Sequence, residues 1–238
     1  MRLIGVDLGA QPARTSVCEM AWDERPAVVA IDSAADDDLI VEWCQGADAV
    51  GIDSPFGWPL GFVDLVRRQA TTESTLTGTT SEELRMRRTD VFAWRETGKQ
   101  PLSVSTDKLA IVAFRCVRLL ERLRGPAFDR SGTDGVYEVY PGGALAKWGL
   151  PSRAYKRTKG LPVRERIVAE LAPVIDFGPF APRVLDCDDD LDAVLCAYLA
   201  GLATQGATRP PPADDAAFAA VEGWIHLPSG PLGDDIPR

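Results

Sequence analysis

Short apolar runs separated by turn residues open the chain, in a pattern typical of strands. Residues 2–8, 13–20, 26–32 and 49–53 are four such runs. Between the third and the fourth, residues 36–46 combine an acidic first turn, apolar residues at helical spacing and a final glycine, which predicts a short helix. The order of three strands, a helix and a fourth strand predicts an α/β fold that differs from the regular alternation of a Rossmann fold.

After this opening the pattern becomes mainly helical. Residues 60–130 are interpreted as a helical insertion within a single domain spanning 1–238, and the polar segment 71–80 inside it is predicted to be a mobile loop. A further strand is expected at 137–141. The predicted helices and helical turns cover residues 81–94, 107–124, 143–148, 162–172, 188–204 and 214–221.

Charge is distributed unevenly along the chain. The formal net charge is −9, yet residues 64–166 hold 20 of the 26 Lys and Arg residues and only 12 of the 35 Asp and Glu residues. A basic centre between two acidic flanks fits a carboxylate metal site beside an anion-binding surface. The alternative is that these charges lie on solvated helix faces of different sign.

The cysteines and the apolar segments indicate the cellular setting. The five cysteines are scattered and lack CxxC spacing, which argues against a disulfide framework and against a zinc site. No apolar stretch approaches the roughly 18 residues that a membrane-spanning helix needs, and the first residues do not resemble a signal peptide. We therefore expect a soluble cytoplasmic protein without a membrane partner.

Carboxylates at the ends of predicted elements are the strongest chemical signal. Asp7 and Asp53 each end an apolar strand, and Glu138 lies in a third strand-like segment. Asp189 and Asp192 are three residues apart in a predicted helix, so both can project from one face. Carboxylates without clustered His or Cys suit Mg²⁺ or Mn²⁺, and two such ions can cleave a phosphodiester. The alternative for each residue is an ordinary helix cap or turn.

Seven segments follow one another in a characteristic order. They are GVDLG (5–9), GIDSPFGWP (51–59), RRTD (87–90), EVYPGGALAKWGL (138–150), Tyr155-Lys156, DDLDAVLCAYLAG (189–201) and EGWI (222–225). Together they resemble the DUF429 family, an uncharacterised group proposed to be RNase H-like nucleases. The resemblance implies an RNase H-like mixed sheet flanked by helices. It also implies a metal site formed by Asp7, Asp53, Glu138 and the Asp189/Asp192 pair.

The basic centre provides candidate phosphate ligands. Arg88 and Lys156 lie within the family-like segments, and we predict that they bind substrate phosphate. Trp94, Trp148 and Tyr155 are candidate stacking faces for bases, with burial in the core as the alternative. The partner predicted on these grounds is a nucleic acid, DNA or RNA.

The function that follows is Mg²⁺- or Mn²⁺-dependent hydrolysis of nucleic-acid phosphodiester bonds. Asp7 is expected to bind the metals, Asp53 and Asp189/Asp192 to complete the coordination, and Glu138 to act as an outer ligand or a water-orienting base. The alternative is an RNase H-like protein that binds a nucleotide or phosphate without catalysis. Converging carboxylates favour catalysis, whereas a site filled by an Arg or Lys ion pair favours binding.

Two other chemistries are weaker. Residues 5–9 also resemble the phosphate loop of actin-like ATPases and sugar kinases, but those proteins use two copies of the domain. A serine triad built on Ser54 would need His226, the only histidine. Cys187 stands between two aspartates, whose charges disfavour a thiolate nucleophile.

Overall fold

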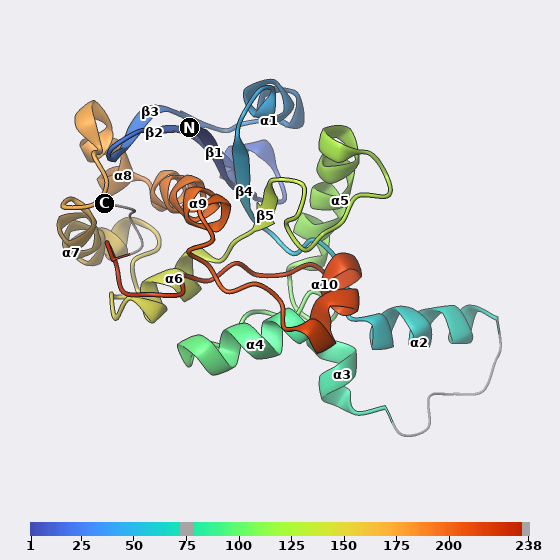
Figure 1. The fold of residues 1–238 in the computed structure, drawn as a ribbon. Coiled ribbons are helices and arrows are strands. Elements are labelled where there is room, and N and C mark those ends of the chain that lie inside the picture. The colour runs from blue at the N-terminus through green and yellow to red at the C-terminus, as the bar shows by residue number, and fades with distance from the viewer. Residues whose placement is uncertain (72–78, 235–238) are drawn as a thin grey trace.

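The computed structural model describes residues 1–71 and 79–234, so 72–78, most of the segment predicted as a mobile loop, lie outside the described residues. The described chain is α/β, with a five-stranded mixed sheet flanked by helices, as predicted from the sequence (Figure 1). The strands are β1 (Arg2–Asp7), β2 (Ser16–Trp22), β3 (Pro26–Ser33), β4 (Ala49–Asp53) and β5 (Val136–Glu138).

The sheet has the order β3-β2-β1-β4-β5. Strands β1 to β3 form an antiparallel meander, whereas β4 runs parallel to β1, and β5 parallel to β4. This mixture of directions is consistent with the RNase H-like fold that the family resemblance implies.

Side-chain alternation divides the sheet into two faces. In β1, Ile4 and Val6 pack into a cluster with α1 (Asp37–Cys44) and α5 (Ala110–Arg124). Leu3 packs into a second cluster on the opposite face, with α9 (Asp188–Thr204). Figure 1 shows α9 on one side of the sheet and α1 and α5 on the other. Since alternate residues of a strand share a face, every odd-numbered residue of β1 faces α9.

Helix α9 is the central helix of the fold. Its residues from Asp188 to Leu202 are buried, as expected of a helix that is apolar on all sides. The sheet covers one side, and α6 (Pro141–Lys147), α7 (Leu161–Leu171) and α8 (Ala181–Asp186) contribute residues to the core cluster on the other. The predicted range 188–204 is confirmed.

Two glycines let α9 approach the sheet closely. A Cβ at Gly5 would lie 2.0 Å from the carbonyl oxygen of Ala193, and one at Gly51 would lie 2.2 Å from that of Cys196. Both obstacles are backbone atoms of α9, so no rotamer change could relieve the overlap. The close spacing between α9 and the sheet therefore requires glycine, which has no side chain, at Gly5 of β1 and Gly51 of β4.

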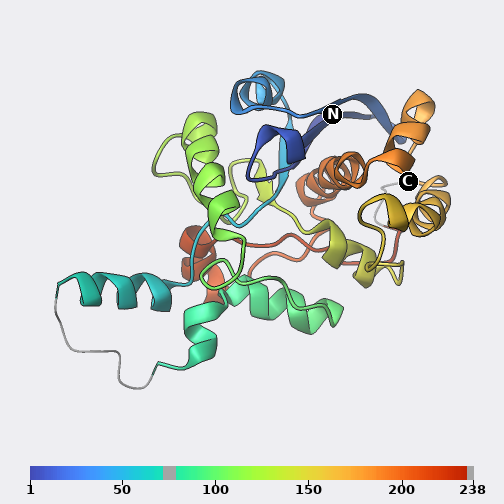
Figure 2. The same cartoon turned by 180° about the vertical axis from the view of Figure 1, so that it is seen from behind.

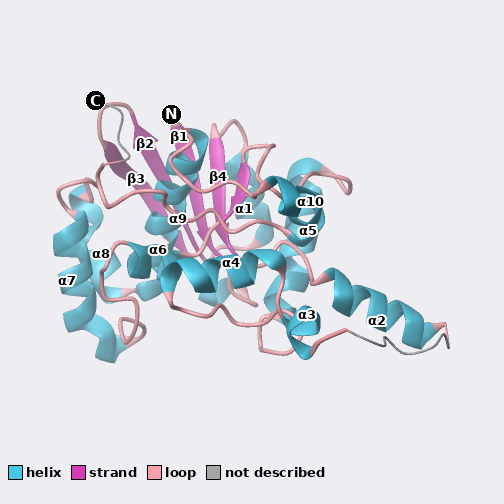
Figure 3. Cartoon of the chain, turned by 60° about the horizontal axis from the view of Figure 1, so that its bottom comes forward, coloured by secondary structure: helices cyan, strands magenta, loops and turns pink. Residues whose placement is uncertain are grey.

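The insertion supplies α2 (Leu60–Ala70), α3 (Ser81–Arg85), α4 (Arg88–Thr97) and α5. Helices α2 to α4 lie beyond the end of the sheet, as Figures 1 and 3 show, and α10 (Ala216–Glu222) lies next to them in Figure 1. Seen from behind, α2 again projects to the side (Figure 2).

Some predicted elements differ from the structure in their bounds. The helix expected at 107–124 begins at Ala110, and the strand expected at 137–141 is β5, which ends at Glu138. The prediction of one continuous helix at 81–94 is wrong. The helix is interrupted at Met86, the C-cap of α3, and Arg87 is the N-cap of α4. The buried guanidinium of Arg87 accounts for the break, since it pairs with Asp90 and with the distant Glu138. The second strand begins at Ser16 and not at 13, because Pro12–Arg14 forms a 3₁₀ turn.

Among the residues that the structure describes, none of the helices combines the length and the apolar character needed to span a membrane.

Candidate metal centre

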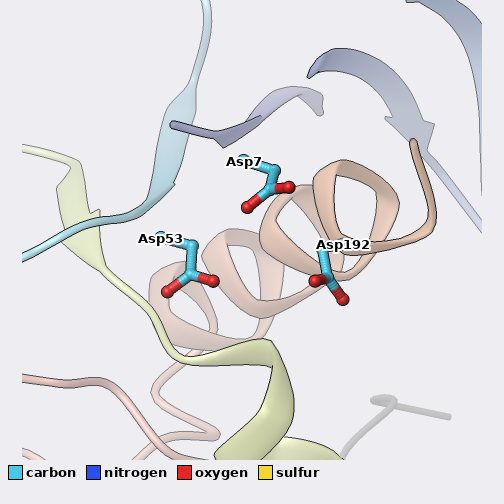
Figure 4. Close-up of side chains that lie close together, drawn as sticks. All are labelled: Asp7, Asp53 and Asp192. Atoms are coloured by element: carbon cyan, nitrogen blue, oxygen red, sulfur yellow. The ribbon is translucent and has the colours of Figure 1, made fainter. Parts of the chain in front are cut away.

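Strand pairing brings Asp7 and Asp53 together. Each is the last residue of its strand, and the two are register partners in the parallel pair β1–β4. Asp7 follows Leu3 and Gly5 on the face toward α9, and Asp53 follows Gly51 on the same face. Figure 4 shows both carboxylates directed toward α9. This part of the predicted site follows from strand alternation and register alone.

Asp192 completes a cluster with these two carboxylates. It lies in the first turns of α9, one residue before Ala193, whose carbonyl faces Gly5. One carboxylate oxygen from each of Asp7, Asp53 and Asp192 lies within 4.8 Å of the other two (Figure 4). The three side chains therefore converge on one point from two strands and one helix.

This donor set suits a hard divalent cation. All three groups offer oxygen, which Mg²⁺ and Mn²⁺ prefer. Oxygens in adjacent positions around one octahedral Mg²⁺ at about 2.1 Å are about 3.0 Å apart, and oxygens in opposite positions are about 4.2 Å apart. Since the three oxygens lie within 4.8 Å of one another, contractions of up to about 2 Å would bring them onto one ion. Asp7, Asp53 and Asp192 are the residues that would bind it.

Burial and mutual repulsion disfavour the charged forms of these carboxyls. Burial raises the pKa of Asp53 to about 7, with a further contribution from the charge of Asp192. Burial also raises the pKa of Asp7 well above its usual value; Lys156 opposes the shift, while Asp192 and Asp53 add to it. A cation among the three groups would relieve both effects.

A lysine already provides positive charge beside the cluster. The ammonium of Lys156 donates a hydrogen bond to Asp192 and lies 3.8 Å from Asp188. The hydroxyl of Tyr155 donates to Asp192 as well, at 3.1 Å. Because the Lys156 side chain is 45% exposed, it can leave the cluster without disturbing the core.

The other aspartates of α9 have different partners. Asp189 accepts a hydrogen bond from Arg14 at 3.3 Å and lies outside the three-carboxylate cluster. Asp190 accepts hydrogen bonds from Ser16 and Ser33 and pairs with Arg183. Of the Asp189/Asp192 pair, therefore, the structure brings only Asp192 to Asp7 and Asp53.

Glu138 belongs to a separate buried network. Its two oxygens accept hydrogen bonds from Arg87 at 2.7 and 2.8 Å, and one of them also accepts from the backbone N–H of Phe56 at 3.0 Å. Arg87 in turn pairs with Asp90, and all three side chains are at most 3% exposed. The predicted role of Glu138 as an outer ligand or base remains a prediction.

A cavity of about 440 Å³ opens beside the cluster. Asp7 and Asp53 contribute to its lining, as do Glu138 and Arg87. Much of the remaining lining comes from the stretch between α4 and α5 and from the first turn of α5, in the range 99–112. The insertion thus forms part of the wall facing the carboxylates.

The predicted phosphate ligands occupy different places. Lys156 lies at the cluster, whereas the guanidinium of Arg88 lies 4.5 Å above the ring of Phe218 and lines another cavity. Among the candidate stacking residues, Tyr155 is buried, Trp148 packs against the core and Trp94 is 42% exposed.

The histidine does not serve a serine triad. His226 Nε2 donates to the carbonyl of Ser131 at 2.8 Å, and Nδ1 accepts from the hydroxyl of Thr208 at 3.0 Å. Both ring nitrogens are therefore engaged away from Ser54. Burial lowers the pKa of His226 to about 4, so the ring is neutral at pH 7.

Two residues of the cavity wall were not singled out by the sequence. Lys99 was part of a general basic cluster, and Tyr140 part of a family-like segment, but both line the cavity beside Asp53. The segment 98–109 that holds Lys99 has no hydrophobic periodicity, so no pattern could have placed it opposite the strand ends.

The comparisons with known proteins agree with the resemblance seen in the motifs. Neither the curated proteins nor the solved structures gave a match. A family model described as "Protein of unknown function (DUF429)" matches residues 5–217. Because this match covers most of the chain, including Asp7, Asp53 and Asp192, the protein belongs to the DUF429 family.

Proposed function

We propose that this protein is a Mg²⁺- or Mn²⁺-dependent nuclease that hydrolyses phosphodiester bonds of nucleic acids. The observation that carries the proposal is the convergence of Asp7, Asp53 and Asp192, with carboxylate oxygens within 4.8 Å of one another, beside a cavity of about 440 Å³. Structural carboxylates are usually paired with Arg or Lys side chains or with caps. Here Asp7 and Asp53 are register partners at the ends of two paired strands. Burial, together with the charges of neighbouring aspartates, raises the pKa of both carboxyls, which supports a site that holds a cation.

The roles of the residues follow from their positions. Asp7, Asp53 and Asp192 would hold the metal, which when bound supplies Lewis-acid activation of the phosphate and of water. Asp192 is oriented by the Tyr155 hydroxyl. Glu138 fixes the segment after β4, because it accepts a hydrogen bond from the N–H of Phe56 three residues beyond Asp53. In this proposal Glu138 is a positioning residue for Asp53.

Lys156 supports binding of phosphate. Its ammonium is already at the carboxylates and is half exposed, so it can transfer from Asp192 to an incoming anionic substrate. This exchange would keep a positive charge beside the phosphate while freeing a carboxylate oxygen.

One observation favours the second candidate, a non-catalytic nucleotide- or phosphate-binding protein. The contact between Lys156 and Asp192 partly neutralises the cluster without any metal. In that case the cavity would bind its ligand while the carboxylates served only to position the lysine.

Calorimetric titration with Mn²⁺ tests the proposal on the wild type, Asp7→Asn and the control Asp23→Asn, whose side chain is 92% exposed in a turn. We expect binding in the wild type and the control, and none in Asp7→Asn. Cleavage of single- and double-stranded DNA and RNA should show the same dependence. Metal-dependent cleavage that survives Asp7→Asn would refute the assignment, and Mn²⁺ binding without cleavage of any substrate would favour the second candidate.

A further inference from the structure

The cavity next to the carboxylates has a mainly apolar wall. Its lining includes Leu8, Pro101, Leu102, Leu109, Val112 and Ile225. Its volume of about 440 Å³ lies within the range of roughly 300–1,000 Å³ found for pockets that bind small molecules. An apolar enclosure of this size suits one planar, uncharged group better than an extended polyanion.

Lys99 is the basic group available to a ligand in this cavity. Its ammonium donates hydrogen bonds to the carbonyl oxygens of Gly142 and Ser152 and lies 5.7 Å from the centre of the Tyr140 ring. A lysine ammonium has three donors, so one remains for a ligand. Lys99 lines the same cavity as Asp7 and Asp53. Burial lowers the pKa of its ammonium, and the charges of Asp192 and Asp53 oppose that shift.

Lys156 lies at the carboxylates and outside the lining of this cavity, so the described basic residues in the lining are Lys99 and Arg87. Arg87 also lines it, but its five N–H donors are all used, by Asp90, Glu138 and the carbonyl of Glu222. Arg88 lines a different cavity, above Phe218. Within the part of the chain that the structure describes, Lys99 is thus the basic side chain in this cavity with a donor to spare.

The wall also carries one polar group suited to a base. Tyr140 lines the cavity together with Asp53, whose charge adds to the effect of burial in raising the pKa of the Tyr140 phenol. It has no hydrogen-bond partner among the described residues. A phenol can both donate and accept a hydrogen bond, as the edge of a nucleobase requires.

We infer that the cavity accepts a single unpaired nucleotide of a nucleic-acid strand, with its phosphate between Lys99 and the carboxylates and its base against the apolar wall. This inference rests on the proposed nuclease function and specifies its substrate class as single-stranded nucleic acid. A base within a duplex would first have to leave its stack, which requires a few kcal/mol. A cavity that receives one base apart from its neighbours therefore selects against continuous duplex.

Binding tests the inference without requiring hydrolysis. The probe is a fluorescein-labelled thymidine hexanucleotide, followed by anisotropy in Ca²⁺ and compared with a two-stranded blunt-ended duplex that carries the same label. We expect the hexanucleotide to bind at least tenfold more tightly than the duplex. Lys99→Ala should weaken its binding by about tenfold or more, the effect of losing a charged hydrogen bond. Lys99→Arg should restore most of the affinity.

Lys108→Gln is the matched control, because it removes the same charge from an exposed position of the same insertion. Equal binding of the hexanucleotide and the blunt-ended duplex, or equal effects of Lys99→Ala and Lys108→Gln, would overturn the inference. Hydrolysis is then measured with Mn²⁺ on the same two probes and on bis(4-nitrophenyl) phosphate. Selective binding of the hexanucleotide without hydrolysis of any of the three substrates would refute the nuclease proposal and support the single-strand site. Hydrolysis of both nucleic acids at equal rates would support the nuclease proposal and refute the single-strand site.

Discussion

The ammonium of Lys156 contacts the carboxylate of Asp192, the one member of the three-carboxylate cluster that comes from a helix. The lysine reaches it from the loop before α7, where Ala154 and Arg157 both have positive φ angles, of 60° and 63°. Hydrogen bonds from Arg164 to the carbonyls of Tyr155 and Arg157 hold this loop in place. The fold thus maintains an unusual backbone conformation that presents a cation to the candidate metal site.

Lys156→Gln should therefore bind Mn²⁺ more tightly than the wild type, because the metal no longer has to displace an ammonium. The lysine side chain is 45% exposed, and ion pairs of this kind are worth about 1 kcal/mol or less, so we expect at most about a fivefold decrease in Kd. The same variant should show a higher KM for an oligonucleotide if the lysine also binds phosphate. Calorimetry and steady-state kinetics separate the two effects, and an unchanged Kd for Mn²⁺ would show that Lys156 does not compete with the metal.

Asp53→Asn should change how stability depends on pH. In the folded protein the pKa of Asp53 is raised to about 7, above the value of 3.8 for a free side chain. Between pH 4 and pH 7 the folded state holds a proton on Asp53 that the unfolded chain has released. The contribution of this proton to the free energy of unfolding is therefore complete below pH 4 and is lost as the pH rises through 7. Asn carries no such charge, and the variant should gain stability over the wild type from pH 5 to pH 8.

Thermal unfolding in EDTA at several pH values measures this difference, with Asp23→Asn as the exposed control. If the difference in unfolding temperature between the wild type and Asp53→Asn stays constant from pH 5 to pH 8, the raised pKa of Asp53 is contradicted. The same substitution should abolish Mn²⁺ binding, so stability and metal affinity should change in opposite directions at pH 8.

Arg87→Met should strongly destabilise the fold. The guanidinium is 2% exposed and lies between the buried carboxylates of Asp90 and Glu138, so its removal leaves two uncompensated charges. Loss of one partner from a buried ion pair typically costs about 3–5 kcal/mol. Urea unfolding should show this loss for Arg87→Met and a much smaller one for Arg88→Met, whose side chain is exposed; similar midpoints would argue against the network.

Gly5→Ala should be far more damaging than an alanine at Gly46. The added methyl would lie 2.0 Å from the carbonyl oxygen of Ala193, whereas nothing lies within 4 Å of a Cβ at Gly46 despite its φ of +70°. We expect about 3 kcal/mol or more of lost stability for Gly5→Ala, at the upper end of overpacking effects, and about 1–2 kcal/mol for Gly46→Ala from its left-handed backbone. Urea unfolding of both variants checks the ranking, and equal losses would contradict the close helix–sheet contact.

The sequence was sufficient for the parts of the structure that depend on local periodicity. Strand alternation and a final Asp in each apolar run predicted both the sheet and the meeting of Asp7 with Asp53, since paired parallel strands end at the same edge. Periodicity could not distinguish Asp189 from Asp192, because residues three apart share a helix face. Contacts with Arg14 and Lys156, which come from distant segments, separate the two.

Long-range electrostatics explain what the sequence did not reveal. The break between α3 and α4 depends on the ion pair of Arg87 with Glu138, 51 residues away. Lys99 reaches the cavity because its ammonium binds the carbonyls of Gly142 and Ser152, which follow β5. Local composition could not identify the partners of Arg87 or of Lys99, since an arginine or lysine in a basic helical segment more often lies in solvent.

The backbone contacts at Gly5 and Gly51 fix the spacing of the three carboxylates but place no such constraint on the opposite wall of the cavity. Asp7, Asp53 and Asp192 are attached to two strands and a helix whose main chains already touch, so compensating changes in core side chains cannot alter the spacing of the carboxylates. The opposite wall is built from the segment around Lys99 to Val112, which is free of this constraint. Relatives with different ligands should therefore differ in that segment, while keeping the three carboxylates at the same spacing.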